Sequence, residues 1–94
     1  MDDEYDSFEW DEAKSERNRV MRGFGFAYAS RVFLGRHLLE ESRADPGERR
    51  FVATGPVDEV IITVVWTPRG ATRRIISAWR ASRKERRRYY AHNS

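Results

Sequence analysis

One segment of the chain, residues 60–66, constrains the possible folds more than any other. It reads Val60-Ile61-Ile62-Thr63-Val64-Val65-Trp66 and is apolar at nearly every position. β-Branched and aromatic residues favour strands, and a strand that lacks polar alternation is covered on both faces. This segment is therefore predicted to be the central strand of a sheet. With 94 residues, the chain is expected to form a single small domain over 1–94.

Two helices are predicted before this strand. Residues 8–10 alternate between apolar and polar side chains, which indicates a short strand. A helix over 12–22 follows, with Asp11 as its N-cap and Gly23 at its end. Its apolar side chains, which are expected to face the core, are Ala13, Val20 and Met21. Apolar residues at helical spacing over 26–33 predict a second, shorter helix.

From residue 37 onward the apolar period changes to two, which is typical of strands. The expected strands cover 37–41, 51–54, 60–66 and 72–79, with turns at 45–47, 55–58 and 67–70. In the last strand, alternation places Arg74 and Arg80 on one face. Ser82 and Glu85 form a capping box for a final helix over 83–91. The chain is therefore predicted to be an α+β domain, with an antiparallel sheet of about four strands and helices packed on one face.

Charge is distributed very unevenly along the chain. Residues 1–16 contain eight acidic residues and one lysine, and residues 1–7 are expected to form a disordered acidic tail. Residues 69–94 contain nine basic residues and one acid. All but two of the basic residues in the chain are arginine, whose planar fork binds phosphate and stacks on bases. The basic C-terminal third favours nucleic acid as a ligand, and a solvated charged surface is the alternative.

Several function classes lack their sequence signatures. The chain contains no cysteine, which excludes a disulfide scaffold and thiolate metal sites and fits a cytoplasmic location. No apolar run approaches the roughly 20 residues that a membrane span needs. The two histidines, His37 and His92, are too far apart for metal-ligand spacing, so neither a metal nor a cofactor is expected.

Three segments of the chain resemble the BrnT family of bacterial toxins. The first runs from Phe8 to Lys14 and the second from Arg50 to Gly55. The third and most specific contains Ile75-Ile76-Ser77-Ala78, followed by Arg80-Ala81-Ser82 and Glu85-Arg86. The resemblance covers about residues 8–90. Relatives often read Lys-His-Gly where this chain has Met21-Arg22-Gly23. If that histidine acts as a base, the activity is impaired here; if it packs or binds phosphate, Arg22 can substitute.

The resemblance implies a fold like that of the RelE ribonucleases and the toxin role in a type II toxin–antitoxin pair. The implied activity is an endoribonuclease of the mRNA interferase type, which arrests translation. The implied partner is a BrnA-like antitoxin with a ribbon-helix-helix part, through which alone the complex contacts operator DNA. No membrane partner is implied.

RNA cleavage can use the 2′-OH of the RNA as its nucleophile, which requires a base, an acid and a cation beside the phosphate but no metal. We predict that four arginines serve as phosphate and transition-state ligands: Arg50, Arg74, Arg80 and Arg83. Four residues of the last helix are predicted to bind RNA: Lys84, Arg87, Arg88 and Tyr89. The candidates for proton transfer are Glu85, Lys84, Tyr89 and His37, and Glu85 has a competing role in the capping box. Because no general base is evident, a non-catalytic nucleic-acid-binding module is the alternative function.

Overall fold

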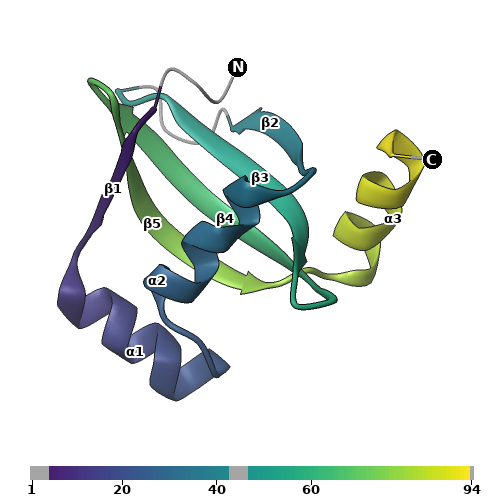
Figure 1. Cartoon of the computed structure of the whole chain (residues 1–94), viewed down its shortest axis with the longest axis horizontal. Helices are drawn as coiled ribbons and strands as arrows, with labels where there is room; N and C mark the ends of the chain where they lie inside the picture. The colour runs from purple at the N-terminus through teal and green to yellow at the C-terminus, as the bar shows by residue number, and fades with distance from the viewer. Residues whose placement is uncertain (1–4, 43–46, 94) are drawn as a thin grey trace.

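The computed structural model describes residues 5–42 and 47–93. Within them a five-stranded sheet has helices on both sides, which confirms the α+β class (Figure 1). The elements are β1 (Ser7–Trp10), α1 (Glu12–Arg22), α2 (Phe26–Ala29), the 3₁₀ helix η2 (Ser30–Leu34), β2 (Leu38–Ser42), β3 (Arg50–Val57), β4 (Val60–Arg69), β5 (Thr72–Arg80) and α3 (Arg83–His92). None of the helices in this described part is long and apolar enough to cross a membrane.

The strand predicted to be central is central. The order across the sheet is β1-β5-β4-β3-β2, so two strands lie on each side of β4. Strands β2 to β5 are antiparallel, whereas β1 pairs with β5 in parallel. On β4, Ile62, Val64 and Trp66 point toward α2 and η2 and are at most 2% exposed. They form the main core with Phe26 and Val32 of the covering helices.

Helix α1 has the predicted ends but not the predicted buried face. Asp11 accepts hydrogen bonds from two backbone N–H groups of the first turn, and Gly23 ends the helix with a φ of 95°. The apolar stripe, however, faces solvent: Val20 is 66% and Met21 78% exposed. The buried side chains are polar, Ser15 and Asn18, because α1 is held to the chain after it by hydrogen bonds. Asn18 donates to the Phe24 carbonyl, and the Phe26 N–H donates to Ser15.

Two predicted turns begin too early, because the strands run through most of their residues and only Asp58 and Gly70 lie in the observed turns. Gly55 and Pro56 lie inside β3, and Pro68 lies inside β4. Each proline lies beyond the last paired residue of one neighbouring strand, where a sheet tolerates the missing N–H. The β3–β4 turn is made instead by Asp58 and Glu59, both with positive φ. The turn predicted at 45–47 lies largely outside the described residues.

Residues 5–7, predicted to belong to a disordered tail, are part of the fold. The Tyr5 ring packs edge-on against Trp66 at 5.2 Å between centroids. The Asp6 N–H donates to the carbonyl of Ala71, and Ser7 begins β1. Residues 1–4 lie outside the described part of the chain. The segment predicted as one helix over 26–33 divides into α2 and the tighter η2.

The last helix lies on the opposite side of the sheet from α2, so the prediction that all helices share one face is wrong. Tyr89 of α3 packs with Leu38, Ile61 and Ala81 in a second buried cluster. Ile61 alternates with the core residue Ile62 and therefore points the other way. In Figure 1, α1 and α3 stand at opposite sides of the sheet. We call the face that carries α3 the open face; its strand side chains are buried or half-buried, with Thr63 and Thr67 among the buried ones.

Candidate nucleic-acid interface

The open face consists of the alternate side chains of β3, β4 and β5 that point away from α2. By their position in the strands these are Arg50, Val52, Thr54, Ile61, Thr63, Val65, Thr67, Thr72, Arg74, Ser77 and Trp79. Alternation within β5 is interrupted once along this set. The register between β4 and β5 shifts at Val65/Trp66, so Ile76 is an extra residue in β5.

This bulge separates two of the predicted phosphate ligands. Arg74 lies opposite Thr67 on the open face, whereas Arg80 lies opposite Ile62 on the face that packs against the helices. The prediction that the two arginines share a face is therefore wrong, because an extra residue reverses the alternation beyond it.

Arg50 and Arg74 are brought together on the open face. Phe51 of β3 pairs with Trp66 of β4, so the next residue along, Arg50, lies level with Thr67. Thr67 in turn pairs with Arg74 of β5. Two strand spacings then separate their backbones by about 10 Å. Each guanidinium has a carboxylate partner: Arg50 with Glu48 at 3.0 Å and Arg74 with Glu9 at 3.0 Å. Both arginines remain about one-third exposed, so a phosphate can reach them by displacing a carboxylate.

The other two predicted ligands are placed elsewhere. Arg80 lines a cavity of about 410 Å³ between β4, β5 and the segment that joins α1 to α2, together with Arg19, Phe24 and Tyr28. Arg83 is exposed in the first turn of α3. The structure therefore does not gather the four predicted arginines into one site.

Helix α3 presents its basic residues to solvent. Lys84 and Arg87 are exposed, and Arg88 forms an ion pair with Glu40 of β2 at 3.4 Å. Tyr89, predicted to stack on RNA, is only 7% exposed, and its hydroxyl donates to the Arg36 carbonyl. It anchors the helix and has no ring face for a base, whereas its neighbour Tyr90 is 58% exposed.

Glu85 joins α3 to the open face. Its Oε1 atom accepts three hydrogen bonds, from the Ser82 N–H at 2.8 Å, the Thr63 hydroxyl at 3.1 Å and the Trp79 ring N–H at 3.2 Å. Partial burial would raise the pKa of Glu85, but these hydrogen bonds together outweigh it and hold the pKa below its usual range. The carboxylate is ionised at neutral pH. The predicted capping box is present, and Glu85 serves two strands in addition.

The remaining candidates for proton transfer lie far from the arginines of the open face. His37 follows η2, where its Nδ1 lies 2.8 Å from the Gly35 carbonyl and its ring packs edge-on against Phe33. Tyr89 is buried, as described above. In the described ranges, 5–42 and 47–93, no group of three His, Asp or Glu side chains could hold a metal ion.

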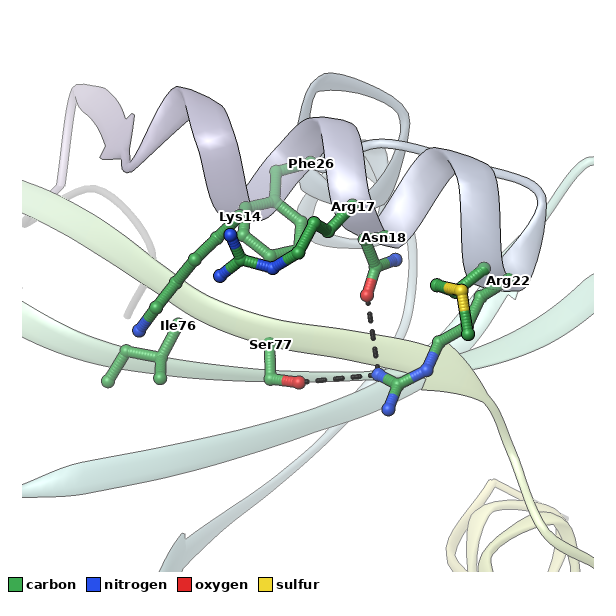
Figure 2. A pocket seen from close by; sticks show the side chains of 8 residues that line it. Lys14, Arg17, Asn18, Arg22, Phe26, Ile76 and Ser77 are labelled. Atoms are coloured by element: carbon green, nitrogen blue, oxygen red, sulfur yellow. Dashed lines mark hydrogen bonds between the residues drawn. The ribbon is translucent and has the colours of Figure 1, made fainter.

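A second cationic region, which the sequence reasoning missed, lies between α1 and β5. Lys14, Arg17 and Arg22 extend from α1 toward the part of β5 that β1 leaves unpaired (Figure 2). The open pocket between them has a volume of about 500 Å³. Its remaining lining residues are Asn18, Met21, Phe26, Ile76 and Ser77. We call this region the α1–β5 groove.

Arg22 is fixed in the groove by one of its nitrogens. Its Nη1 donates to the Ala78 carbonyl at 2.9 Å and to the Asn18 side chain at 3.3 Å, with the Ser77 hydroxyl at 3.4 Å. The guanidinium also lies 5.9 Å from the centre of the Trp79 ring. The sequence shows Lys14, Arg17 and Arg22 at helical spacing. It does not show which strand this basic side of the helix faces.

The fold and these surfaces define a small α+β protein with cationic regions on a sheet face and along the unpaired part of its β5 strand. The chain belongs to the family described as "Ribonuclease toxin, BrnT, of type II toxin-antitoxin system", whose model matches residues 10–85. It is thus a ribonuclease toxin by family, and a toxin of this type has an antitoxin partner and an RNA substrate. No curated protein matches the chain.

Proposed function

We propose that the chain is a metal-independent endoribonuclease of the mRNA interferase type, which arrests translation in the cytoplasm. The observation that carries this proposal is the pair formed by the partly exposed Arg50 and Arg74 on the sheet face that carries α3, in a BrnT-family chain. An RNA strand crossing that face meets Arg50 and Arg74, whose backbones are about 10 Å apart, at one end and the basic helix α3 at the other. The arrangement is consistent with a RelE-like ribonuclease.

The proposed reaction uses the RNA as its own nucleophile. The 2′-oxygen loses its proton and attacks the adjacent phosphorus, and the bond from phosphorus to the 5′-oxygen breaks. The products are a 2′,3′-cyclic phosphate and a 5′-hydroxyl, whose proton comes from an acid. Arg50 and Arg74 stabilise the charge that develops on the phosphate oxygens. Arg80 lies on the other face and is not part of this site.

Three of the four candidates for proton transfer lie in α3, and of these Glu85 and Lys84 are not buried as Tyr89 is. Glu85 contacts Thr63, four residues along β4 from the partner of Arg74, so proton transfer requires the RNA to bring its 2′-OH from α3 toward the arginine pair. Glu85 is ionised and therefore able to accept a proton, although its three hydrogen bonds weaken it as a base. Lys84 is exposed and is proposed as the acid for the leaving oxygen. Lys84, Arg87 and Arg88 are proposed to hold the RNA backbone.

We further propose a BrnA-like antitoxin with a ribbon-helix-helix part as the partner. The simplest inhibition is to cover α3 and the open face with acidic side chains, which excludes RNA. Operator DNA is then contacted only through the antitoxin.

The test is expression of the chain in bacteria, with Arg74→Ala beside the wild type. The wild type should arrest growth and leave RNA fragments that end in 2′,3′-cyclic phosphate, with cleavage in vitro unaffected by a chelator. Loss of one charge-stabilising group typically costs about 100- to 1,000-fold in rate, so Arg74→Ala should relieve the arrest. Arg80→Ala, matched in charge and in strand, should still arrest growth.

Three results would contradict the proposal. Intact RNA in arrested cells would remove the ribonuclease activity, and RNA binding without cleavage would favour the non-catalytic module. A folded Arg74→Ala protein that arrests growth at the wild-type rate would remove the open face as the site.

A further inference from the structure

The cations of the α1–β5 groove differ from the arginines of the open face in that they have no ion-pair partner among the described residues. Arg50, Arg74 and Arg88 each have a carboxylate within ion-pair distance. Lys14, Arg17 and Arg22 have none among the described residues, and no acidic side chain lines the groove. Asp11 at the start of α1 acts on the side chains of Lys14 and Arg17 only through space and does not line the groove, so an anion in the groove is stabilised by all three cations.

Arg22 is the best positioned of the three. Its Nη1 is held by the β5 backbone and by Asn18, which itself is fixed by its bond to the Phe24 carbonyl. Its Nε and Nη2 have no hydrogen-bond partner in the described part of the chain. A guanidinium that is oriented by one nitrogen while the others stay free is preorganised for an anionic oxygen.

The groove suits a single nucleic-acid strand better than an isolated anion. Lys14 and Arg22 are eight residues apart on α1, which corresponds to about 12 Å along the helix axis. Between these cations the groove is lined by the apolar side chains of Ile76, Phe26 and Met21. Separated cations over an apolar floor match a chain in which phosphates alternate with flat bases.

The groove is also connected to the open face. Ser77 belongs to both, and Arg22 lies over the ring of Trp79, which donates to Glu85 on the open side. A strand that enters along α1 therefore reaches the unpaired part of β5 beside the proposed site of cleavage.

We propose that the α1–β5 groove binds the sugar-phosphate backbone of the RNA substrate on one side of the cleaved bond, with Arg22 as its principal phosphate ligand. Lys14 and Arg17 contact the neighbouring phosphates. Asn18 is a positioning residue that orients Arg22. This inference rests on the proposed ribonuclease function, because it names RNA as the occupant.

The test is binding of a short single-stranded RNA with 2′-O-methyl groups, which cannot be cleaved, measured by fluorescence anisotropy over a range of salt. Arg22→Gln should weaken binding about tenfold. It should also reduce the slope of log affinity against log salt by about 0.7, as the loss of one phosphate contact requires. Because Arg22 also bonds the β5 backbone, the double variant Lys14→Gln/Arg17→Gln is measured in parallel. Those two side chains make no hydrogen bond within the described ranges, and circular dichroism confirms folding of each variant.

The matched control is Arg31→Gln. Arg31 lies on η2 in an ion pair with Asp58 at 2.8 Å, away from both cationic regions. Its loss removes the same charge and should leave the affinity and the salt slope unchanged.

The outcomes separate this inference from the proposed function. If the wild type binds and cleaves RNA but the groove variants bind with the wild-type slope, the groove is not an RNA site, whereas the ribonuclease stands. If those variants instead lose affinity only for the cognate antitoxin, the groove is a protein contact and the inference is overturned. If the wild type neither binds nor cleaves RNA, both proposals are wrong.

Discussion

Arg73 shows that a charge counted in the sequence need not be a charge on the surface. It is 4% exposed, and its guanidinium carbon lies 4.1 Å from the ring centre of Phe33 and 5.0 Å from that of Trp66. Tyr5 and Phe8 face it as well. The negative faces of aromatic rings attract a cation, so this arginine belongs to the packing of the core. Arg73 is therefore not among the basic residues of the C-terminal third that can contact a polyanion.

Glu85 leads to a prediction at the same scale. Its pKa is lowered in the folded chain, so the stability that it contributes is present above its unfolded value, near pH 4.3, and is lost as the pH falls through the folded value. Glu85→Gln should therefore show a flatter fall of unfolding free energy below about pH 4 than the wild type. Glu85→Ala, which also loses the cap, should be about 1–2 kcal/mol less stable at neutral pH.

Urea unfolding between pH 3 and pH 7 measures both effects. Glu12→Gln is the control, because that carboxylate is exposed and lies outside this network. Identical acid profiles for Glu85→Gln and the wild type would contradict the assigned role of the three hydrogen bonds.

At the scale of the element, Tyr89 is the buried apolar anchor of α3, beside the polar contacts of Glu85 and Arg88. Tyr89 packs with Leu38, Ile61 and Ala81, whereas the basic residues around it are exposed. Tyr89→Ala should therefore loosen the helix and weaken its docking on the sheet by about 3 kcal/mol or more. Limited trypsin digestion should cleave this variant within residues 83–88 much faster than the wild type.

Tyr90→Ala is the control for this variant, because Tyr90 is exposed. Equal cleavage rates for Tyr89→Ala and the wild type would show that α3 is held by other contacts.

The elements also show where sequence reasoning reaches its limit. The β-branched run of β4, the ends of α1 and the capping box of α3 were predictable because each depends on local side-chain chemistry. The parallel pairing of β1 with β5 was not, since it joins segments that are remote in sequence. No residue type near Ile76 marks the bulge in the sequence. Strict alternation without that extra residue therefore predicts the wrong face for Arg80. Pro56 and Pro68 were read as turns because the end of the neighbouring strand is invisible in the sequence.

For the whole molecule, the same limit applies to the candidate site. The basic C-terminal third was evident, but the fold distributes it among the core, both sheet faces and α3. Arg50 and Arg74 were predicted individually and lie together only because β3, β4 and β5 are neighbours. The α1–β5 groove contains Lys14 from the acidic segment 1–16, together with Arg17 and Arg22 just after it, and a count of charges along the chain does not point to these cations.

The parallel pair of β1 and β5 has a consequence for the order of events during synthesis. Ser7 pairs with Thr72, so β1 has no partner until 65 further residues have been made. At ribosomal rates of about 5 to 20 residues per second, that interval is roughly 3 to 13 s. We expect residues 7–22 of ribosome-arrested chains that stop before Thr72 to stay sensitive to protease, and protection of that segment would contradict the expectation. Until β5 emerges, the growing chain has neither the α1–β5 groove nor the arginine pair, so under the proposed function it has no site for RNA during its own synthesis.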